Sequence, residues 1–194
     1  MRRALRPTTP CWAWPPGLQA SASTACREQV EILDGVLRSQ LSAYDGRYYQ
    51  VRDAWKLTVV QRPRPPLVIA ALGPRALRVV ARFAATWNSL GGQPISAVEG
   101  GSGERLTFEQ AVAETRRQTE LLDRYCTEAG RDPRQVARSV AAYRVDPPPF
   151  TSVDAFEKFV GRYREIGMQE FVFYWPPNAG AATAEPCGWR RRVG

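Results

Sequence analysis

The chain has 194 residues, of which 44% are hydrophobic and 24% charged, a composition typical of a globular protein with a single good core. The formal net charge of +8 invites a nucleic-acid interpretation, but the excess lies at the ends. Residues 1–26 carry three arginines and no acid, and residues 179–194 carry three arginines against one glutamate. The nearly balanced body argues against a nucleic-acid-binding surface.

Two absences narrow the chemistry further. The sequence contains no histidine, which excludes a His-containing catalytic triad and a His-ligated metal. Its four cysteines have no CxxC spacing, so we expect no metal, free thiols and a reducing, cytoplasmic compartment. No apolar run approaches the roughly 20 residues of a membrane-spanning helix, so we expect no membrane partner.

The N-terminal part divides into an irregular segment and a helix. Pro15, Pro16 and Gly17 interrupt the apolar stretch of residues 1–26, which argues against a signal peptide and predicts irregular structure. Residues 27–43 predict an amphipathic helix. Its expected buried face is Val30, Leu33, Val36, Leu37 and Leu41, and its expected exposed residues are Glu28, Glu31, Asp34 and Arg38. Residues 44–61 predict an extended arm or loop.

The stretch of residues 46–92 predicts a strand–helix–strand unit around which the rest of the chain is organised. Residues 67–72 form a continuous apolar run after two prolines, which is typical of a strand buried on both faces. Gly73 and Pro74 then predict a sharp turn into a helix, and residues 86–90 predict a second strand. A βαβ unit of this kind implies parallel strands joined by a right-handed crossover.

The turn between the first strand and its helix is the candidate binding site. Backbone N–H groups at a helix start have no intrahelical partner, and the helix dipole adds partial positive charge, so such a turn can hold a phosphate. Every βα turn shares these features and most bind nothing, so the residues alone leave both interpretations open.

The second half of the chain continues the alternation of helices and strands. Residues 93–106 predict a long loop, either a lid or a disordered segment. Residues 107–110 form a capping box for a helix that ends at Gly130. A strand over residues 135–145, a helix capped by Thr151 and closed by Gly167, and a strand over residues 170–175 follow. The tail after the last strand lacks periodicity.

The sequence resembles the luciferase-like monooxygenase family, whose members are FMN- or deazaflavin (F420)-dependent oxidoreductases built on a (β/α)8 TIM barrel. The motifs that carry the resemblance are Gly46-Arg47-Tyr48-Tyr49, Pro65-Pro66, Gly73-Pro74 and Ala85-Thr86-Trp87-Asn88. Two of them depart from the family pattern. Ala70-Ala71-Leu72 stands where many flavin members are Gly-rich and is closer to the deazaflavin type, and Ala85-Thr86 replaces the usual Ala-Asp-Gly.

The resemblance implies an α/β fold that is a partial TIM barrel, namely its last four βα units. It divides the chain into an irregular segment (residues 1–26), a half-barrel domain (27–177) and an irregular tail (178–194). In the family, the flavin ring and the catalytic side chains are contacted largely from the first half of the barrel, including histidine positions absent here. We therefore assign no catalytic residue.

Two hypotheses about function remain. The chain is either an FMN- or F420-dependent oxidoreductase acting on a small molecule, in a truncated form, or a non-catalytic half-barrel, which is a fragment without activity or a protein that functions by pairing. A half-barrel leaves two strand edges and an apolar inner face uncovered, so we expect a homodimer or a poorly soluble chain. The resemblance places the cofactor's phosphate-bearing side chain at Ala70, Ala71, Leu72, Gly73, Pro74, Arg75, Trp87 and Asn88.

Overall fold

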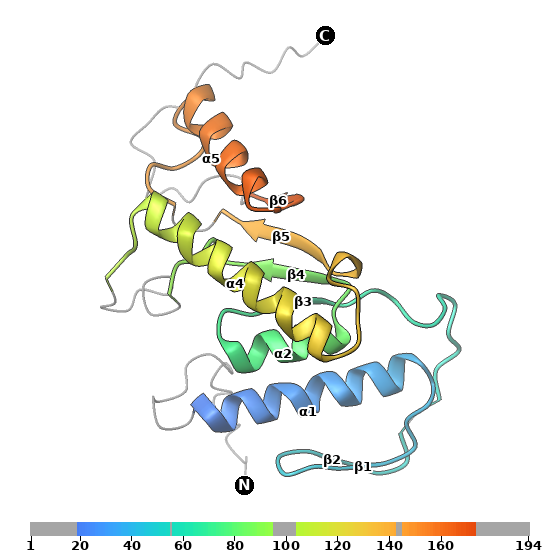
Figure 1. Ribbon diagram of the computed structural model, residues 1–194. Helices are drawn as coiled ribbons and strands as arrows, with labels where there is room; N and C mark the ends of the chain where they lie inside the picture. Colours follow the sequence, from blue (N-terminus) through green and yellow to red (C-terminus); the bar gives the residue numbers. More distant parts are fainter. Residues whose placement is uncertain (1–18, 55, 95–103, 143–144, 174–194) are drawn as a thin grey trace, which may run out of the picture. The chain divides into compact units, whose positions relative to one another are not determined.

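The computed structural model describes residues 19–54, 56–94, 104–142 and 145–173 (Figure 1). Contacts between Cα atoms divide the chain into two compact units, Met1–Pro65 and Pro66–Gly194. The division falls inside the domain predicted over residues 27–177. Within the described residues, none of the helices combines the length and the apolar character needed to cross a membrane.

The first unit is built on helix α1 (Gln19–Leu37). The prediction of irregular structure up to residue 26 is wrong from Gln19 onward, because the helix begins there rather than at residue 27. Residues 19–26 contain three alanines and neither glycine nor proline, which is enough to extend a helix backward from a strongly helical neighbour. Residues 1–18, the rest of that predicted segment, lie outside the described part of the chain.

Helix α1 ends earlier than predicted and is followed by a small hairpin. Ser39 adopts a left-handed φ of 56°, and the N–H groups of Gln40 and Leu41 bond back to the Gly35 carbonyl, so Leu41 lies beyond the helix. Strands β1 (Tyr44–Asp45) and β2 (Gln50–Val51) then pair antiparallel. They fall within the stretch predicted as an extended arm.

The second unit contains a four-stranded parallel sheet in the order β3-β4-β5-β6. The strands are β3 (Val68–Ala70), β4 (Thr86–Ser89), β5 (Ala137–Ala141) and β6 (Glu170–Val172). This order confirms the predicted adjacent parallel strands, although each strand is shorter than its predicted range. The predicted strand ends at residues 143–144 and 174–175 lie outside the described residues.

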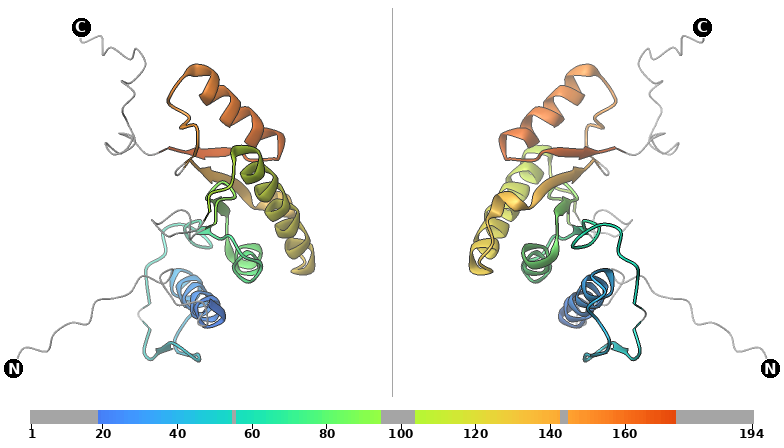
Figure 2. Two further views of the ribbon diagram at one scale, coloured as in Figure 1. Left: turned by 90° about the vertical axis from the view of Figure 1, so that its left-hand side faces the viewer. Right: turned by 90° about the vertical axis from the view of Figure 1, so that its right-hand side faces the viewer.

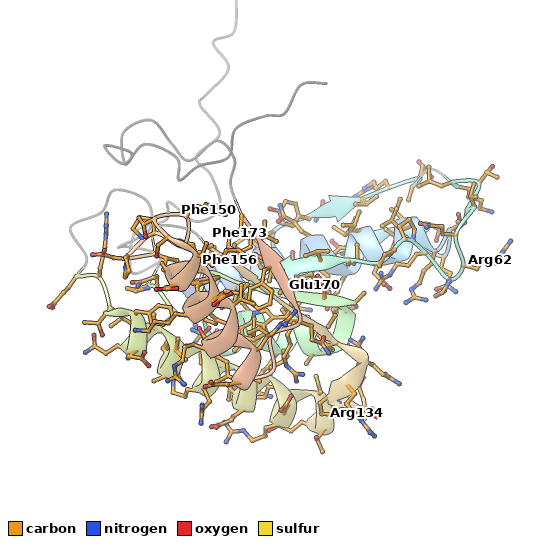
Figure 3. All side chains as sticks on the ribbon, turned by 90° about the horizontal axis from the view of Figure 1, so that it is seen from above. Arg62, Arg134, Phe150, Phe156, Glu170 and Phe173 are labelled. Atoms are coloured by element: carbon orange, nitrogen blue, oxygen red, sulfur yellow. The ribbon has the colours of Figure 1, made fainter. Side chains whose placement is uncertain are left out.

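Three helices cover one face of this sheet: α2 (Pro74–Phe83), α4 (Phe108–Glu128) and α5 (Val153–Glu165) (Figure 2). The core lies between the sheet and these helices. Its largest fully buried side chains include Trp87, Leu77, Leu122, Phe159 and Tyr163. A second aromatic cluster of Phe150, Phe156 and Phe173 gathers at the start of α5, with ring centroids 5.1–6.2 Å apart (Figure 3).

The opposite face of the sheet is partly open. Strand β3 was predicted to be buried on both faces, but Val68 is 65% exposed and Ala70 is exposed, while Ile69 packs against the core. Strand β6 shows the same alternation, with Val172 42% exposed. The prediction failed because β3 lies at an edge of the sheet, a position that an apolar run alone does not reveal.

Most of the predicted helix boundaries hold. Thr107 and Gln110 form the expected capping box of α4, and Gly130 adopts a φ of 70° after the helix. A 3-10 turn, η2 (Pro133–Gln135), precedes β5. The cap of α5 is Ser152, whose hydroxyl accepts from the Ala155 N–H, rather than Thr151, whose hydroxyl donates to the Pro148 carbonyl.

Candidate functional site

The candidate site lies where β3 turns into α2, at the carboxyl edge of the parallel sheet. Gly73 is the N-cap residue of α2, with extended backbone angles (φ −99°, ψ 161°), and no side chain caps the helix there. Pro74 occupies the first turn, and the first intrahelical bond runs from the Leu77 N–H to the Gly73 carbonyl (3.0 Å). The turn thus presents backbone donors at a helix start that lacks a capping side chain.

Gly73 has a different role from the one the sequence suggests. Its φ of −99° is open to any residue, so the sharp turn does not require glycine. A Cβ atom built on Gly73 meets nothing within 4 Å. The absent side chain therefore leaves open space directly in front of the helix start, which is the feature that a ligand approaching the backbone needs.

The charges around the turn are positive. The first turn of α2 contains no acid, and the exposed Arg75 makes no ion pair among the described residues. Arg78 is engaged elsewhere: it bonds to the Glu128 carboxylate (2.6 Å) and lies 3.9 Å from the centre of the Tyr125 ring. The hydrogen bond to Glu128 raises the pKa of the Arg78 guanidinium. Arg75 is therefore the cation best placed to meet an anion here.

Trp87 supports the turn from behind and does not face a ligand. Its side chain is completely buried, and its indole N–H donates to the Ala71 carbonyl at 2.9 Å. Ala71 itself is 4% exposed. The predicted direct contacts of Trp87 and Ala71 with a cofactor therefore do not fit their positions. Both residues instead fix the path of the chain as it leaves β3.

Asn88 and Ala70 lie on the open face of the sheet, in one row across the strands. The register pairs Ala70 with Asn88, Asn88 with Ser139, and Ser139 with Glu170. The Asn88 amide donates to the Ser139 hydroxyl at 3.0 Å. Residues that the strand alternation places on one face thus form a polar row of amide, hydroxyl and carboxylate, beside the exposed Ala70.

Sequence reasoning missed Ser139 and Glu170. The signal was weak: both lie in predicted strands, but which face each one occupies depends on the register, and a single predicted strand does not define it. Of the remaining predicted site residues, Leu72 is half-buried and Pro74 is exposed. The structure therefore brings together Ala70, Leu72, Gly73, Pro74, Arg75 and Asn88 near the same end of the sheet.

A second turn at this edge follows β4 and is tightly packed. Gly91 and Gly92 both adopt left-handed φ angles, and a Cβ on Gly92 would lie 2.1 Å from the Ala111 carbonyl oxygen. The Tyr163 hydroxyl donates to the Gly91 carbonyl at 2.9 Å. Burial raises the pKa of Tyr163 to about 12, so the phenol stays neutral and acts as a structural donor.

Gln93 closes the base of the loop that follows. Its side-chain amide donates to the Leu106 carbonyl (2.8 Å) and accepts from the Leu106 N–H (3.0 Å). These two bonds join the start and the end of the predicted lid. Residues 95–103, the centre of that loop, lie outside the described part of the chain.

In the first unit, Glu28 organises the Gly46-Arg47-Tyr48-Tyr49 motif. Its carboxylate is 2% exposed and accepts from the backbone N–H groups of Arg47, Tyr48 and Tyr49 at 3.0, 2.8 and 3.2 Å. Burial opposes its ionisation, but the backbone donors outweigh this effect and lower the pKa of the carboxyl.

This arrangement corrects the predicted face of α1. Glu28, predicted to be exposed, is buried, while Leu33, predicted to be buried, is 44% exposed. It also explains Gly46, because a Cβ there would lie 2.5 Å from a Glu28 carboxylate oxygen. The hydroxyl of Tyr49 accepts from the Gln29 side chain (2.7 Å), so this part of the motif packs on α1.

Among the described residues, no group of His, Cys, Asp or Glu side chains could hold a metal ion. Cys126 is a free thiol, as predicted; Cys11 and Cys187 lie outside the described residues. Cys126 is completely shielded from solvent in the core, and this burial raises the pKa of its thiol. It is therefore a packing residue.

Comparison with known proteins points to one protein family. The model of the luciferase-like monooxygenase family matches residues 22–145. No curated protein sequence matches the chain. Solved structures that resemble it include two F420-dependent enzymes. The coenzyme F420-dependent tetrahydromethanopterin reductase from Methanopyrus kandleri has 17% identity and a TM-score of 0.48, with 62% of this chain and 30% of that chain covered.

The second is an F420-dependent secondary alcohol dehydrogenase in complex with an F420-acetone adduct. It has 12% identity and a TM-score of 0.54, with 82% of this chain and 57% of that chain covered. The present chain thus spans 30% of the first structure and 57% of the second. The shared fold confirms the predicted α/β architecture, a parallel sheet consistent with part of a TIM barrel. With the family model covering more than half of its residues, the chain belongs to the luciferase-like monooxygenase family.

Proposed function

We propose that this chain carries the phosphate-binding part of an FMN- or F420-dependent oxidoreductase, and that the turn of residues 72–75 binds the phosphate-bearing side chain of the cofactor. The observation that carries the proposal is the start of α2. It combines a helix N-terminus without a capping side chain, open space at Gly73 and no acid in the first turn. Phosphates bind at such termini through backbone N–H groups and the helix dipole.

The residues present fit this role in chemistry as well as in position. The N–H groups of Arg75 and Ala76 supply directional donors, and the exposed Arg75 side chain supplies a formal positive charge. Trp87 holds the turn in place through the Ala71 carbonyl, so the donors are preorganised.

Asn88 and Glu170 lie on the same face of the sheet as Ala70, where they offer hydrogen-bonding groups to a polar ring, and the buried Ser139 accepts a hydrogen bond from the Asn88 amide. When bound, either cofactor supplies hydride or electron transfer to a small-molecule substrate. The family membership and the F420-dependent structural neighbours favour this reaction class over a binding module without redox chemistry.

Titration separates phosphate recognition from ring recognition. The chain is titrated with FMN and with riboflavin, which lacks the phosphate, while cofactor fluorescence is followed. F420 and its deazaflavin chromophore without the phosphate-bearing side chain form the second pair. A charged hydrogen bond contributes about 1.5–3 kcal/mol, so we expect at least one phosphorylated member to bind roughly tenfold or more tightly than its partner.

A pair of substitutions then locates the site. Gly73→Trp fills the open space and should abolish the preference for the phosphorylated compound. Gly73→Ala is the matched control, because a Cβ meets nothing there, and it should retain the preference. Equal binding of phosphorylated and unphosphorylated compounds, or unchanged binding in Gly73→Trp, would contradict the proposal.

A further inference from the structure

The inner face of the parallel sheet, opposite its three helices, is exposed mainly at its two edges. On β3 the exposed residues are Val68 and Ala70, and on β6 they are Glu170 and Val172. The central strands lack this pattern: Ser139 and Ala141 on β5 are each 2% exposed. Apolar side chains are therefore open to solvent on the same face of both edge strands.

The backbone at both edges also has hydrogen-bonding groups that point away from the sheet and have no strand partner among the described residues. The Leu67 carbonyl accepts from the Thr86 N–H (3.2 Å), and the Ala71 N–H donates to the Asn88 carbonyl (3.3 Å). Because successive residues of a strand point their peptide groups in opposite directions, those of Val68 and Ala70 point away from β4.

The same alternation applies at the other edge. The Val172 carbonyl accepts from the Ala142 N–H (2.9 Å), so the peptide groups of Phe171 point away from β5. Each copy of the chain thus has one free edge at β3 and another at β6, and these two strands run in the same direction.

We propose that two copies of this chain join edge to edge, with β6 of each copy beside β3 of its partner, and close an eight-stranded parallel barrel. Pairing of two different edges is head-to-tail. Such an interface forms a closed ring only if repeating the rotation between neighbouring copies brings the last copy back onto the first. Two four-stranded sheets related by a two-fold axis along the barrel form such a closed ring. Eight strands also make a barrel whose interior side chains alone can fill.

A second copy fits the open face because of what that face contains. The exposed inner residues of the edge strands are mostly small or apolar (Val68, Ala70 and Val172), as suits the packed interior of a barrel. Each edge strand has only three residues, so pairing adds few hydrogen bonds. Burial of the exposed residues of the two edge strands is therefore the main source of stability.

Closure would bring two candidate sites to one mouth. All eight strands would point the same way, so both turns of residues 72–75 would open at the same end of the barrel. The assembly does not depend on the proposed function, and it is measured without any cofactor. Failure of either proposal therefore leaves the other to be tested separately.

A cysteine pair tests the geometry directly. Within one copy, Ala70 and Val172 lie on strands separated by three inter-strand spacings, roughly 14 Å, whereas a disulfide needs Cα atoms within about 7 Å. A disulfide between the two introduced cysteines of Ala70→Cys/Val172→Cys must therefore join two copies. The double variant Val68→Cys/Val172→Cys tests the alternative register, in which β3 of one copy is shifted by two residues along β6 of the other.

We expect one of the two double variants to form a covalent dimer on a non-reducing gel after mild oxidation. The single-cysteine variants control for the native thiols and should remain monomeric on the same gel. Absence of the covalent dimer in both double variants would overturn the proposal.

A proline pair tests the same edge by mass in solution. Val68→Pro removes an outward N–H without touching the β3–β4 bonds, and proline is tolerated on an edge strand. Val153→Pro is the matched control: Val153 is also an exposed valine, 70% against 65%, at the first position of α5, where proline is accepted. Circular dichroism verifies that both variants are folded.

By light scattering, we expect twice the mass of one chain for the wild type and for Val153→Pro, and half that value for folded Val68→Pro. If Val68→Pro fails to fold, the cysteine pairs decide. A wild type of single-chain mass would overturn the proposal, and would assign the open face to another part of the same chain or to a different protein.

Discussion

Gly73→Asp is expected to stabilise the fold while it abolishes phosphate binding. Gly73 already has the extended backbone of an N-cap residue, and a Cβ there is unobstructed. An aspartate can therefore accept from the free N–H of Arg75 or Ala76, which are the donors proposed for the phosphate. The same atoms cannot serve both acceptors.

The gain in stability can be estimated from three contributions. Replacing glycine by a capping residue contributes a few tenths of a kcal/mol in the folded state. Restricting the unfolded chain contributes about 0.4–1 kcal/mol, and a negative charge at the helix start about 0.3–1 kcal/mol. We expect the free energy of unfolding to rise by about 1–2 kcal/mol for Gly73→Asp, and by about 0.5–1 kcal/mol for the uncharged cap Gly73→Ser.

The loss of binding has an electrostatic origin. Two unit charges about 4 Å apart repel by about 4 kcal/mol at an effective dielectric constant of 20, and salt screening reduces this value at an exposed turn. We therefore expect Gly73→Asp to weaken binding of the phosphorylated cofactor at least about tenfold, and Gly73→Ser, which competes for the same donors without the repulsion, to weaken it less.

Urea unfolding followed by circular dichroism measures the stability, and fluorescence titration measures the binding. A Gly73→Asp variant that is more stable but binds the cofactor as tightly as wild type would refute the placement of the phosphate. A variant with no gain in stability would show that the donors at the start of α2 are already satisfied.

Three further outcomes follow from single contacts. Gly92→Ala should lower the free energy of unfolding by more than about 2 kcal/mol in urea, because its φ is 77° and the new Cβ would lie 2.1 Å from the Ala111 oxygen; a neutral result would contradict this packing. Trp87→Phe should lower the same free energy by about 2–4 kcal/mol, since it leaves a small cavity and deprives the buried Ala71 carbonyl of its donor; a loss below 1 kcal/mol would argue against that bond. Because the pKa of Glu28 is lowered in the folded state, its stabilising contribution relative to Glu28→Gln is present above its ordinary pKa of 4.5 and is lost as the pH falls through the lowered folded-state value. Thermal unfolding of both proteins between pH 7 and pH 3 measures this difference, and a difference that stays constant down to pH 3 would count against it.

The alternation of strands and helices was predictable because its signals are local. The proline pair before β3, the capping box at Thr107 and the left-handed glycine at Gly130 each act within a few residues of the boundary they define. The turn into α2 was predictable for the same reason, since Pro74 favours a first helical position.

Features that depend on distant contacts were not predictable in this way. Helical periodicity placed Glu28 on the solvent side, but its burial comes from three N–H groups about twenty residues away. The polar row depends on the register between strands, which brings Asn88 beside Ser139 across fifty-one residues of sequence. Trp87 matched a family motif, but only its packing distinguishes a support for the turn from a ligand contact.

The close approach of Glu28 to Gly46 links two positions that evolution must alter together. The carboxylate occupies the volume that any side chain at position 46 would need, and it also supplies the acceptor that shapes the turn beyond it. Among relatives of this chain, a residue shorter than glutamate at position 28 should therefore accompany the loss of glycine at position 46. Such paired variation would provide a criterion for recognising this helix-and-turn element in divergent sequences, even where the rest of the motif has drifted.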